Sequence, residues 1–175
     1  MTSNPLPNME PLCASLFTKA DEQIERIRHL IDLLPEDRLD WQPPAANAWT
    51  PGILLGHLLE CLAGFCAVFL AAEPERLAHY SDLRLLPVNL FCGKQEAIVR
   101  IAAYRVHIRQ AFELLADASL ARTIPTIFTP HGETLMTLLL GNLEHLINHK
   151  HQLFIYLRLL GVNVSSRDLY CFRGP

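Results

Sequence analysis

The sequence predicts an all-α protein, a four-helix bundle, and three observations lead to this fold class. Four long segments repeat apolar residues at steps of three, four and seven, the spacing of one helix face. Prolines mark the breaks between these segments. No segment shows the alternation typical of a strand, and no repeat of 20–50 residues is present. We expect antiparallel helices in a single domain over residues 1–175, with 1–10 and 165–175 as peripheral tails.

The first helix is expected from about Pro11 to Leu34, where Pro35 ends it. The following segment, PEDRLDWQPPAANAWTPG, contains four prolines and two tryptophans. It is too broken for a helix and too apolar for a loose tether. We therefore expect an ordered loop that packs Trp41 and Trp49 against one end of the bundle.

The second helix is expected to begin with Thr50 as N-cap and Pro51 in its first position, and to end near Ala72. A connection over residues 73–90 follows, with room for a short helical turn. The third helix is expected over about 94–116, where apolar residues recur at helical spacing.

Residues 124–128 resemble an extended segment, and Thr129-Pro130 repeats the capping arrangement of the second helix. We therefore expect the fourth helix to run from Pro130 to Leu160. Gly161 is a natural stop at its carboxyl end.

The second helix also needs a membrane test. Residues 53–72 are nearly all apolar and long enough to span a bilayer. However, His57 and Glu60 lie inside this stretch, and no basic or aromatic belt flanks it. We interpret it as a buried core helix whose apolar surface reaches a second subunit, which suggests a homodimer.

Composition excludes several classes of protein. Half of the 175 residues are hydrophobic and 19% are charged, which excludes a disordered chain. A net charge of −3 without basic runs argues against nucleic acid and anionic membrane as partners. The N-terminus lacks the features of a signal peptide. Five cysteines without a C-x-x-C pair indicate reduced packing residues in a cytoplasmic protein.

Three histidines are the candidate metal ligands. His145 and His149 lie four residues apart, so a helix places both on one face. His57 lies among leucines of the second helix, where an unpaired imidazole would cost about 1–3 kcal/mol. Three neutral imidazoles would hold a divalent ion and leave one coordination position open, as in catalytic zinc sites. The alternative is that this common spacing arose by chance and His57 bonds a carbonyl group.

Other side chains near these histidines have two readings each. Glu60 could orient a ligand or act as a base, or else pair with a basic residue. Gln152 could bond a metal-bound water or a ligand's second nitrogen. Cys61 shares the face of His57 and could approach the ion, although packing is the more common role of a buried cysteine. Four further histidines are read as surface residues or local hydrogen-bonding groups: His29, His79, His107 and His131.

Two sequence blocks resemble the DinB-like family of damage-inducible bacterial proteins. The first is W-x₇-W-T-P-G-I-L-L-G-H-L-L-E, from Trp41 to Glu60. The second, Thr129 to Gly161, contains the family's H-x₃-H-x₂-Q run and its YLR-x-x-G ending. The matching positions are His145, His149, Gln152, Tyr156, Leu157, Arg158 and Gly161.

The resemblance implies a four-helix bundle, a homodimer and a divalent metal, commonly zinc or nickel, on His57, His145 and His149. The chain departs from the family where an arginine and a glycine often follow the second helix-four ligand. Lys150 and His151 stand there, and helical geometry points His151 away from the metal. Arg158 lies two turns beyond the site, where a salt bridge or a helix cap is expected.

Two functions remain open at this point. Relatives with known activity suggest a metal-dependent enzyme that transfers a low-molecular-weight thiol to a small electrophile, because a divalent ion favours the thiolate. The alternative is a non-enzymatic, stress-associated module that binds metal or a small molecule. A polar pocket at the open position would favour the enzyme, and a fourth ligand such as Cys61 would favour a structural role.

Overall fold

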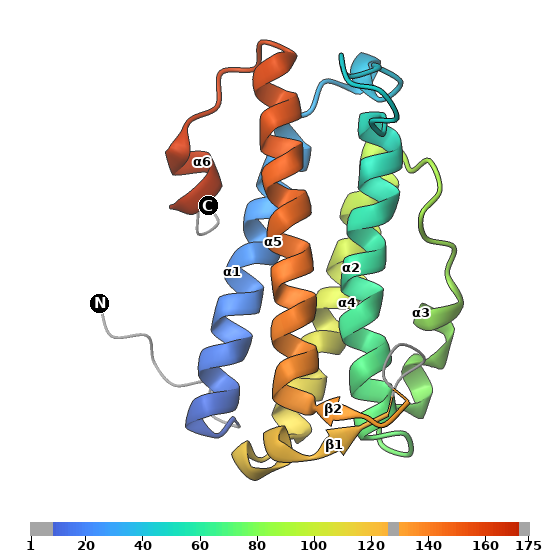
Figure 1. The fold of residues 1–175 in the computed structure, drawn as a ribbon, viewed down its shortest axis with the longest axis vertical. Helices are drawn as coiled ribbons and strands as arrows, with labels where there is room; N and C mark the ends of the chain where they lie inside the picture. The colour runs from blue at the N-terminus through green and yellow to red at the C-terminus, as the bar shows by residue number, and fades with distance from the viewer. Residues whose placement is uncertain (1–8, 126–129, 172–175) are drawn as a thin grey trace.

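The structure is a computed structural model that describes residues 9–125 and 130–171. Its long helices are α1 (Pro11–Leu33), α2 (Pro51–Ala72), α4 (Lys94–Leu114) and α5 (Leu135–Leu159). Between and after them lie η1 (Glu36–Arg38), η2 (Ala78–Tyr80), α3 (Ser81–Leu85), η3 (Asp117–Ala121), β1 (Thr123–Ile124), β2 (Glu133–Thr134) and α6 (Ser166–Tyr170). The predicted all-α bundle is confirmed (Figure 1).

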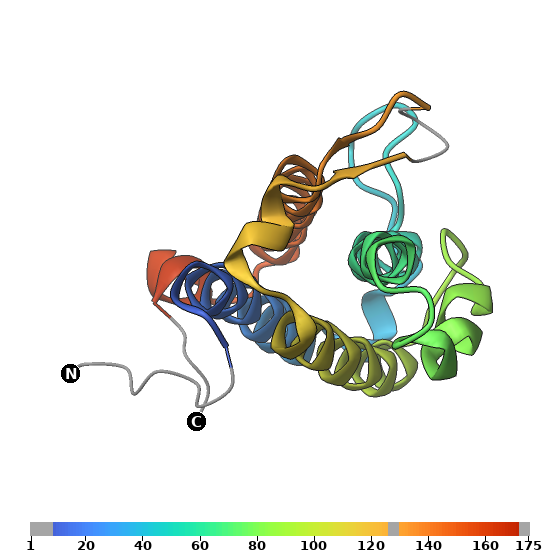
Figure 2. The same ribbon diagram turned by 90° about the horizontal axis from the view of Figure 1, so that it is seen from below.

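Seen along its axis, the bundle has the ring order α1, α4, α2, α5, so that α1 and α2 lie on opposite corners (Figure 2). The connection over residues 73–93 returns the chain along the length of the bundle, and the Cys92 N–H bonds the Gly52 carbonyl at the start of α2. Therefore α2 and α4 run parallel, as do α1 and α5. The expected antiparallel arrangement applies to the pairs α1–α4 and α2–α5.

The start of α2 follows from local chemistry. Thr50 is the N-cap, and its hydroxyl accepts a hydrogen bond from the Ile53 N–H at 3.4 Å. Pro51 occupies the first helical position, where its missing N–H has no intrahelical partner to lose. This predicted N-terminus is confirmed.

The predicted start of the fourth helix is wrong. Residues Glu133 and Thr134 pair with β1 in a two-stranded ribbon, so their backbones are not available for a helix. Thr134, not Thr129, is the N-cap of α5, and its hydroxyl accepts from the Thr137 N–H at 3.2 Å. Thr129 and the expected extended residues 126–128 lie outside the described residues, and His131 lies in a turn before the helix. At the other end Gly161 adopts φ 77°, as expected of a helix stop.

Helix α2 is long and apolar enough to cross a membrane by length and composition, yet 61% of its most apolar window is buried within the bundle. Four cysteines are buried with the core, namely Cys13, Cys61, Cys66 and Cys92. These cysteines therefore pack as apolar side chains, as the sequence indicates.

The segment expected as a peripheral tail contains α6, which packs against α1 (Figure 1). Leu169 is buried, and Asp168 Oδ1 lies within hydrogen-bonding distance of His29 Nε2 in α1, at 2.9 Å. The ammonium group of Lys150, which is 2% exposed, donates to Gln23 Oε1 at 2.7 Å and to the Leu169 carbonyl at 3.1 Å. A buried ammonium on α5 therefore joins α1 and α6.

Candidate metal centre

Helices α2 and α5 bring the three predicted histidines together. His57 Nε2 lies 3.1 Å from His145 Nε2 and 3.0 Å from His149 Nε2. One nitrogen from each ring lies within 4.8 Å of the other two, a grouping that could hold a metal ion. The antiparallel contact of α2 with α5 places the second turn of α2 beside the middle of α5. The structure thus joins residues that are 88 and 92 positions apart in sequence.

The outer nitrogens of two rings face oxygen acceptors. His57 Nδ1 lies 2.6 Å from Asn89 Oδ1 and 3.0 Å from Glu60 Oε2. His149 Nδ1 lies 2.9 Å from Gln152 Oε1, and the Gln152 amide donates to the Tyr156 hydroxyl at 2.9 Å. With the ring proton on Nδ1, each of these rings donates to its oxygen neighbour and presents the lone pair of Nε2 to the centre of the group.

Converging lone pairs repel one another unless a cation or a proton lies between them. Metal–nitrogen bonds of about 2.0–2.1 Å place neighbouring nitrogens about 3.3 Å apart in a tetrahedral site and about 2.9 Å apart in an octahedral one. The observed Nε2 separations of 3.0 and 3.1 Å lie between these two values. The donor set could therefore hold a divalent ion that accepts imidazole ligands.

The surroundings favour neutral imidazoles. Burial lowers the pKa of His145, and the neighbouring His57 lowers it further. Burial likewise lowers the pKa of His149, partly opposed by its hydrogen bond to Gln152. Neutral rings are the form that binds metals, so both shifts prepare the group for a cation.

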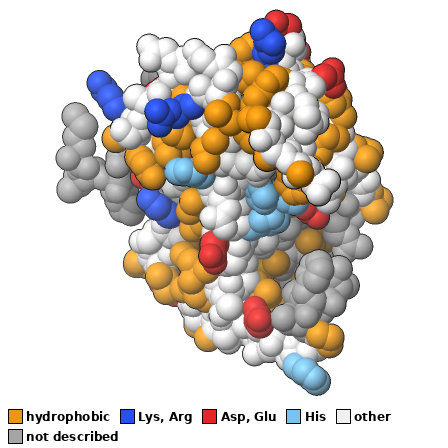
Figure 3. Space-filling model, turned by 45° about the horizontal axis from the view of Figure 1, so that its top comes forward, with side chains coloured by type: hydrophobic (Ala, Val, Ile, Leu, Met, Phe, Trp, Pro, Cys, Tyr) orange, Lys and Arg blue, Asp and Glu red, His pale blue; other side chains and the backbone are white. Residues whose placement is uncertain are grey.

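Aromatic side chains from the proline-rich loop cover this end of the bundle. The Trp49 ring lies 4.5 Å from the His57 ring and 5.7 Å from the His149 ring, measured between centroids. Trp41 packs edge-on against Tyr156 at 5.8 Å. The predicted packing of both tryptophans is confirmed. Trp49 remains 37% exposed, and histidine side chains reach the surface among apolar ones on the face shown in Figure 3.

The other candidates have distinct positions. Glu60 and Gln152 contact the outer nitrogens of ligands, which matches the orienting role considered for each. Cys61 is 1% exposed, burial raises the pKa of its thiol to about 12, and it does not join the histidine group. Packing is therefore its observed role.

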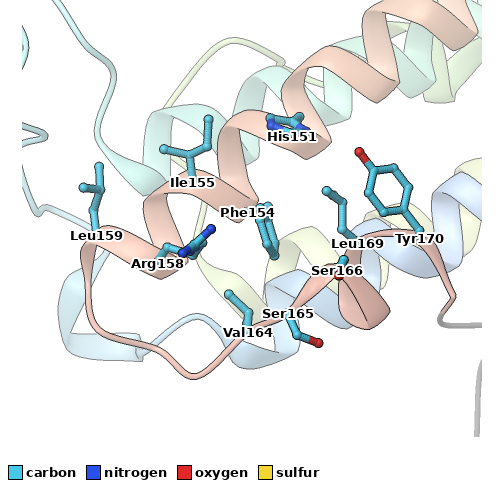
Figure 4. A pocket seen from close by; sticks show the side chains of 10 residues that line it. All are labelled: His151, Phe154, Ile155, Arg158, Leu159, Val164, Ser165, Ser166, Leu169 and Tyr170. Carbon is cyan, nitrogen blue, oxygen red and sulfur yellow. The ribbon is translucent and has the colours of Figure 1, made fainter.

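His151 points away from the metal ligands, as predicted. It lies with Arg158 along a surface groove of about 810 Å³ between the outer face of α5 and α6 (Figure 4). The groove contains none of the three candidate metal ligands, His57, His145 and His149. This groove is therefore separate from the three-histidine group.

Sequence reasoning missed two residues. Asn89 follows a short helix in the least regular connection of the chain, and no motif marks it. The prediction that His107 is a surface or locally bonded residue is wrong, because it is 0% exposed and neither ring nitrogen has a partner within the described part of the chain. Its place on the buried face of α4, three residues after Tyr104 and one before Ile108, is a signal that could have found it.

The structure is thus an all-α bundle in which three imidazoles lie close enough together to hold a metal ion. The model of the DinB superfamily matches residues 19–153, and the chain belongs to that superfamily. A crystal structure of a DinB-like protein from Bacillus subtilis is similar at 20% identity and a TM-score of 0.64. The similarity covers 84% of this chain and 92% of the other, and at this identity it supports the fold alone. Comparison with curated proteins gave no match.

Proposed function

We propose that this chain is a divalent-metal-dependent enzyme that transfers a low-molecular-weight thiol to a small electrophile. The observation that carries the proposal is the convergence of three imidazole nitrogens, Nε2 of His57, His145 and His149. No cysteine or carboxylate joins this group within residues 9–125 and 130–171, which supports an open coordination position. Open sites with three protein ligands are typical of catalytic rather than structural zinc.

When bound, zinc or nickel would lower the pKa of a coordinated thiol and so supply a thiolate at neutral pH. The chain's own residues orient the ligands: Glu60 and Gln152 hold outer nitrogens, and Trp49 packs beside two of the rings. In the transfer, the thiol would release its proton to solvent and its sulfur would bond to the electrophilic carbon. The leaving group departs with the electron pair of the broken bond.

The alternative is a non-enzymatic module that binds metal or a small molecule in response to stress. The same three histidines would serve it, so metal binding alone does not separate the two functions. Turnover does: metal-loaded protein that consumes neither thiol nor electrophile across a panel of both would favour the module.

We also propose that the protein acts as a homodimer in the cytoplasm on a small-molecule substrate, without nucleic acid or membrane. The nearly all-round apolar character of α2 supports the dimer. Light scattering on the purified protein measures its mass directly. A monomer at micromolar concentration would contradict the dimer and leave the metal proposal untouched.

The first test is the metal content of untagged protein by mass spectrometry. We expect about one divalent ion per chain, lost in His57→Ala and His149→Ala while the helical circular dichroism persists. His151→Ala is the matched control, because His151 lies on the same helix and faces the surface groove. Wild-type protein that stays metal-free with added zinc or nickel would overturn the proposal.

A further inference from the structure

Residues 89–92, here called the strap, lie directly against the first turns of α2. The Asn89 N–H donates to the Gly56 carbonyl at 3.2 Å, and the Cys92 N–H donates to the Gly52 carbonyl at 3.0 Å. In Figure 1 the connection that contains the strap runs from α3 along α2 toward the end that bears the proline-rich loop. The strap is thus fixed to the helix that carries His57.

Two glycines make this close approach feasible. A Cβ on Gly56 would lie 1.8 Å from the Leu90 carbonyl oxygen, and a Cβ on Gly52 would lie 2.3 Å from the Phe91 ring. Backbone cannot yield as a flexible side chain can, so position 56 admits only glycine while the strap is in place. The spacing of four residues puts both glycines on one face of α2.

Asn89 reaches from the strap to the metal centre. Its backbone adopts φ 59°, a left-handed conformation that asparagine tolerates better than most residues. This turn aims its Oδ1 at His57 Nδ1, 2.6 Å away. The hydrogen bond requires the proton on Nδ1 and therefore directs the Nε2 lone pair toward the other two histidines.

Glu60 faces the same nitrogen, and a single N–H cannot satisfy both oxygens fully. Glu60 Oε2 is farther, at 3.0 Å, and its side chain is 39% exposed at the end of a flexible stem. Asn89 is nearer, and its backbone is held by its own hydrogen bond to Gly56. The better-anchored acceptor sets the ring, and the carboxylate contributes negative charge near the ion.

We propose that Asn89 is a positioning residue of the metal centre: the strap, seated on Gly52 and Gly56, fixes the His57 ring and tautomer for metal binding. This proposal rests on the metal site of the proposed function. It assigns to the α3–α4 connection a role at the metal centre that its irregular sequence does not reveal. Partners of this kind typically change metal affinity by about 10–100-fold.

The first test compares zinc affinity, measured by chelator competition, across substitutions of Asn89. Glycine keeps the left-handed backbone and removes only the side chain, so Asn89→Gly is expected to weaken zinc binding by about 10-fold or more. Asn89→Asp keeps an acceptor and is expected to retain affinity. Asn47→Gly is the matched control, since Asn47 is the other described non-glycine residue with positive φ, at 61°. Glu60→Gln is expected to cost less than Asn89→Gly.

A second pair of variants displaces the strap without altering any polar side chain. Gly56→Ala forces the Leu90 carbonyl away and is expected to weaken zinc binding about as much as Asn89→Gly. Gly141→Ala is its control, because a Cβ there meets nothing within 4 Å and Gly141 also lies in a ligand-bearing helix. Circular dichroism confirms that each variant is folded.

The third readout is the His57 tautomer in the metal-free protein, from ¹⁵N NMR of the imidazole ring. We expect Nδ1–H in the wild type and in Asn89→Asp, and a larger share of Nε2–H in Asn89→Gly. Equal zinc binding in wild type, Asn89→Gly and Gly56→Ala would overturn the positioning role of Asn89 and leave the metal site itself standing. If the wild type binds no zinc, the metal site fails, and the proposal fails with it unless the tautomer still shifts on removal of the Asn89 side chain.

Discussion

The metal-centre histidines and His107 are two kinds of enclosed imidazole in one bundle. His57 and His149 keep some exposure, and both nitrogens of each ring have a polar neighbour. His107 is 0% exposed, lies stacked on Tyr80 with ring centroids 4.2 Å apart, and has no partner for either nitrogen in the described part of the structure. Burial, with a smaller effect from His79, lowers its pKa to about 4.

The comparison teaches that burial alone does not make a ligand. In the three-histidine group the inner nitrogens share one centre, and at His57 and His149 an acceptor at the outer nitrogen orients the ring toward it. His107 has deeper burial and no such acceptor, and its packing against Tyr80 makes it a neutral core residue. The unpartnered nitrogens of His107 lower the free energy of unfolding, whereas the converging nitrogens of the three-histidine group repel one another when no cation lies between them.

The largest expected effect comes from removing a ligand. His145→Ala should abolish specific zinc binding, a loss beyond the roughly 10–100-fold typical of outer partners, and should leave the fold intact because the ring is partly exposed. His107→Ala should do the reverse, retaining zinc while lowering thermal stability. Metal content and thermal unfolding measured on both variants test the contrast, and zinc loss in His107→Ala would break it.

The next effect is the acid sensitivity of the fold. In the unfolded chain the His107 imidazole is protonated near pH 6.5, and in the folded chain only near pH 4. The unfolded state therefore binds more protons between these two values. The free energy of unfolding should therefore fall as the pH drops through this window, by about 3 kcal/mol in total from His107. Denaturant titrations of metal-free wild type and His107→Phe should diverge by this amount, while His131→Phe should follow the wild type.

A smaller loss of zinc affinity is expected when His149 loses the acceptor at its outer nitrogen and so resembles His107. Gln152→Leu removes the acceptor at His149 Nδ1 without changing the volume greatly. Zinc affinity should fall by about 10-fold, or about 1.4 kcal/mol. Gln152→Glu retains an acceptor at that nitrogen and serves as the control. Unchanged affinity in Gln152→Leu would show that an outer acceptor is not what distinguishes the two kinds of histidine.

The smallest loss of zinc affinity is expected at Tyr156, one hydrogen bond farther from the three histidines than Gln152. Tyr156→Phe removes the hydroxyl that accepts from the Gln152 amide but keeps the ring against Trp41. The loss of one such hydrogen bond is worth about 1 kcal/mol, and only part of it reaches the metal. Zinc affinity should fall less than fivefold by the same chelator competition, and a drop as large as that of Gln152→Leu would place the tyrosine in direct control of His149.

Helix positions and the His145–His149 pair could be predicted because their signals are local or periodic, whereas His57 is assigned to the same site through its apolar setting and the family resemblance. Thr50-Pro51 caps α2 where the sequence indicates, and the four-residue step from His145 to His149 fixes a common face. The start of α5 could not be predicted in the same way. Thr129-Pro130 resembles a cap, but the pairing of Glu133 and Thr134 with β1 decides where the helix begins.

The same limit applies to partners that meet only in the folded chain. Asn89 contacts His57 across 32 positions, through an irregular connection whose path depends on the parallel packing of α2 and α4. His107 shares its helix spacing with core residues, yet a polar ring without partners is a tertiary outcome that spacing does not reveal. The direction of α4 likewise depends on where the preceding connection lies.

The buried ammonium of Lys150 makes the bundle depend on the terminal helix α6, so we expect the shortest stable form of this chain to include α6. Lys150 lies beside His149 in sequence, and α6 supplies one of its two oxygen partners, the Leu169 carbonyl. Burial has already lowered the pKa of Lys150 to about 8. A chain cut after Gly161 would leave this cation to water entering between α1 and α5, or would force it to lose its proton. The short terminal helix α6 therefore supplies a hydrogen-bond acceptor to the buried Lys150 ammonium and keeps water away from it.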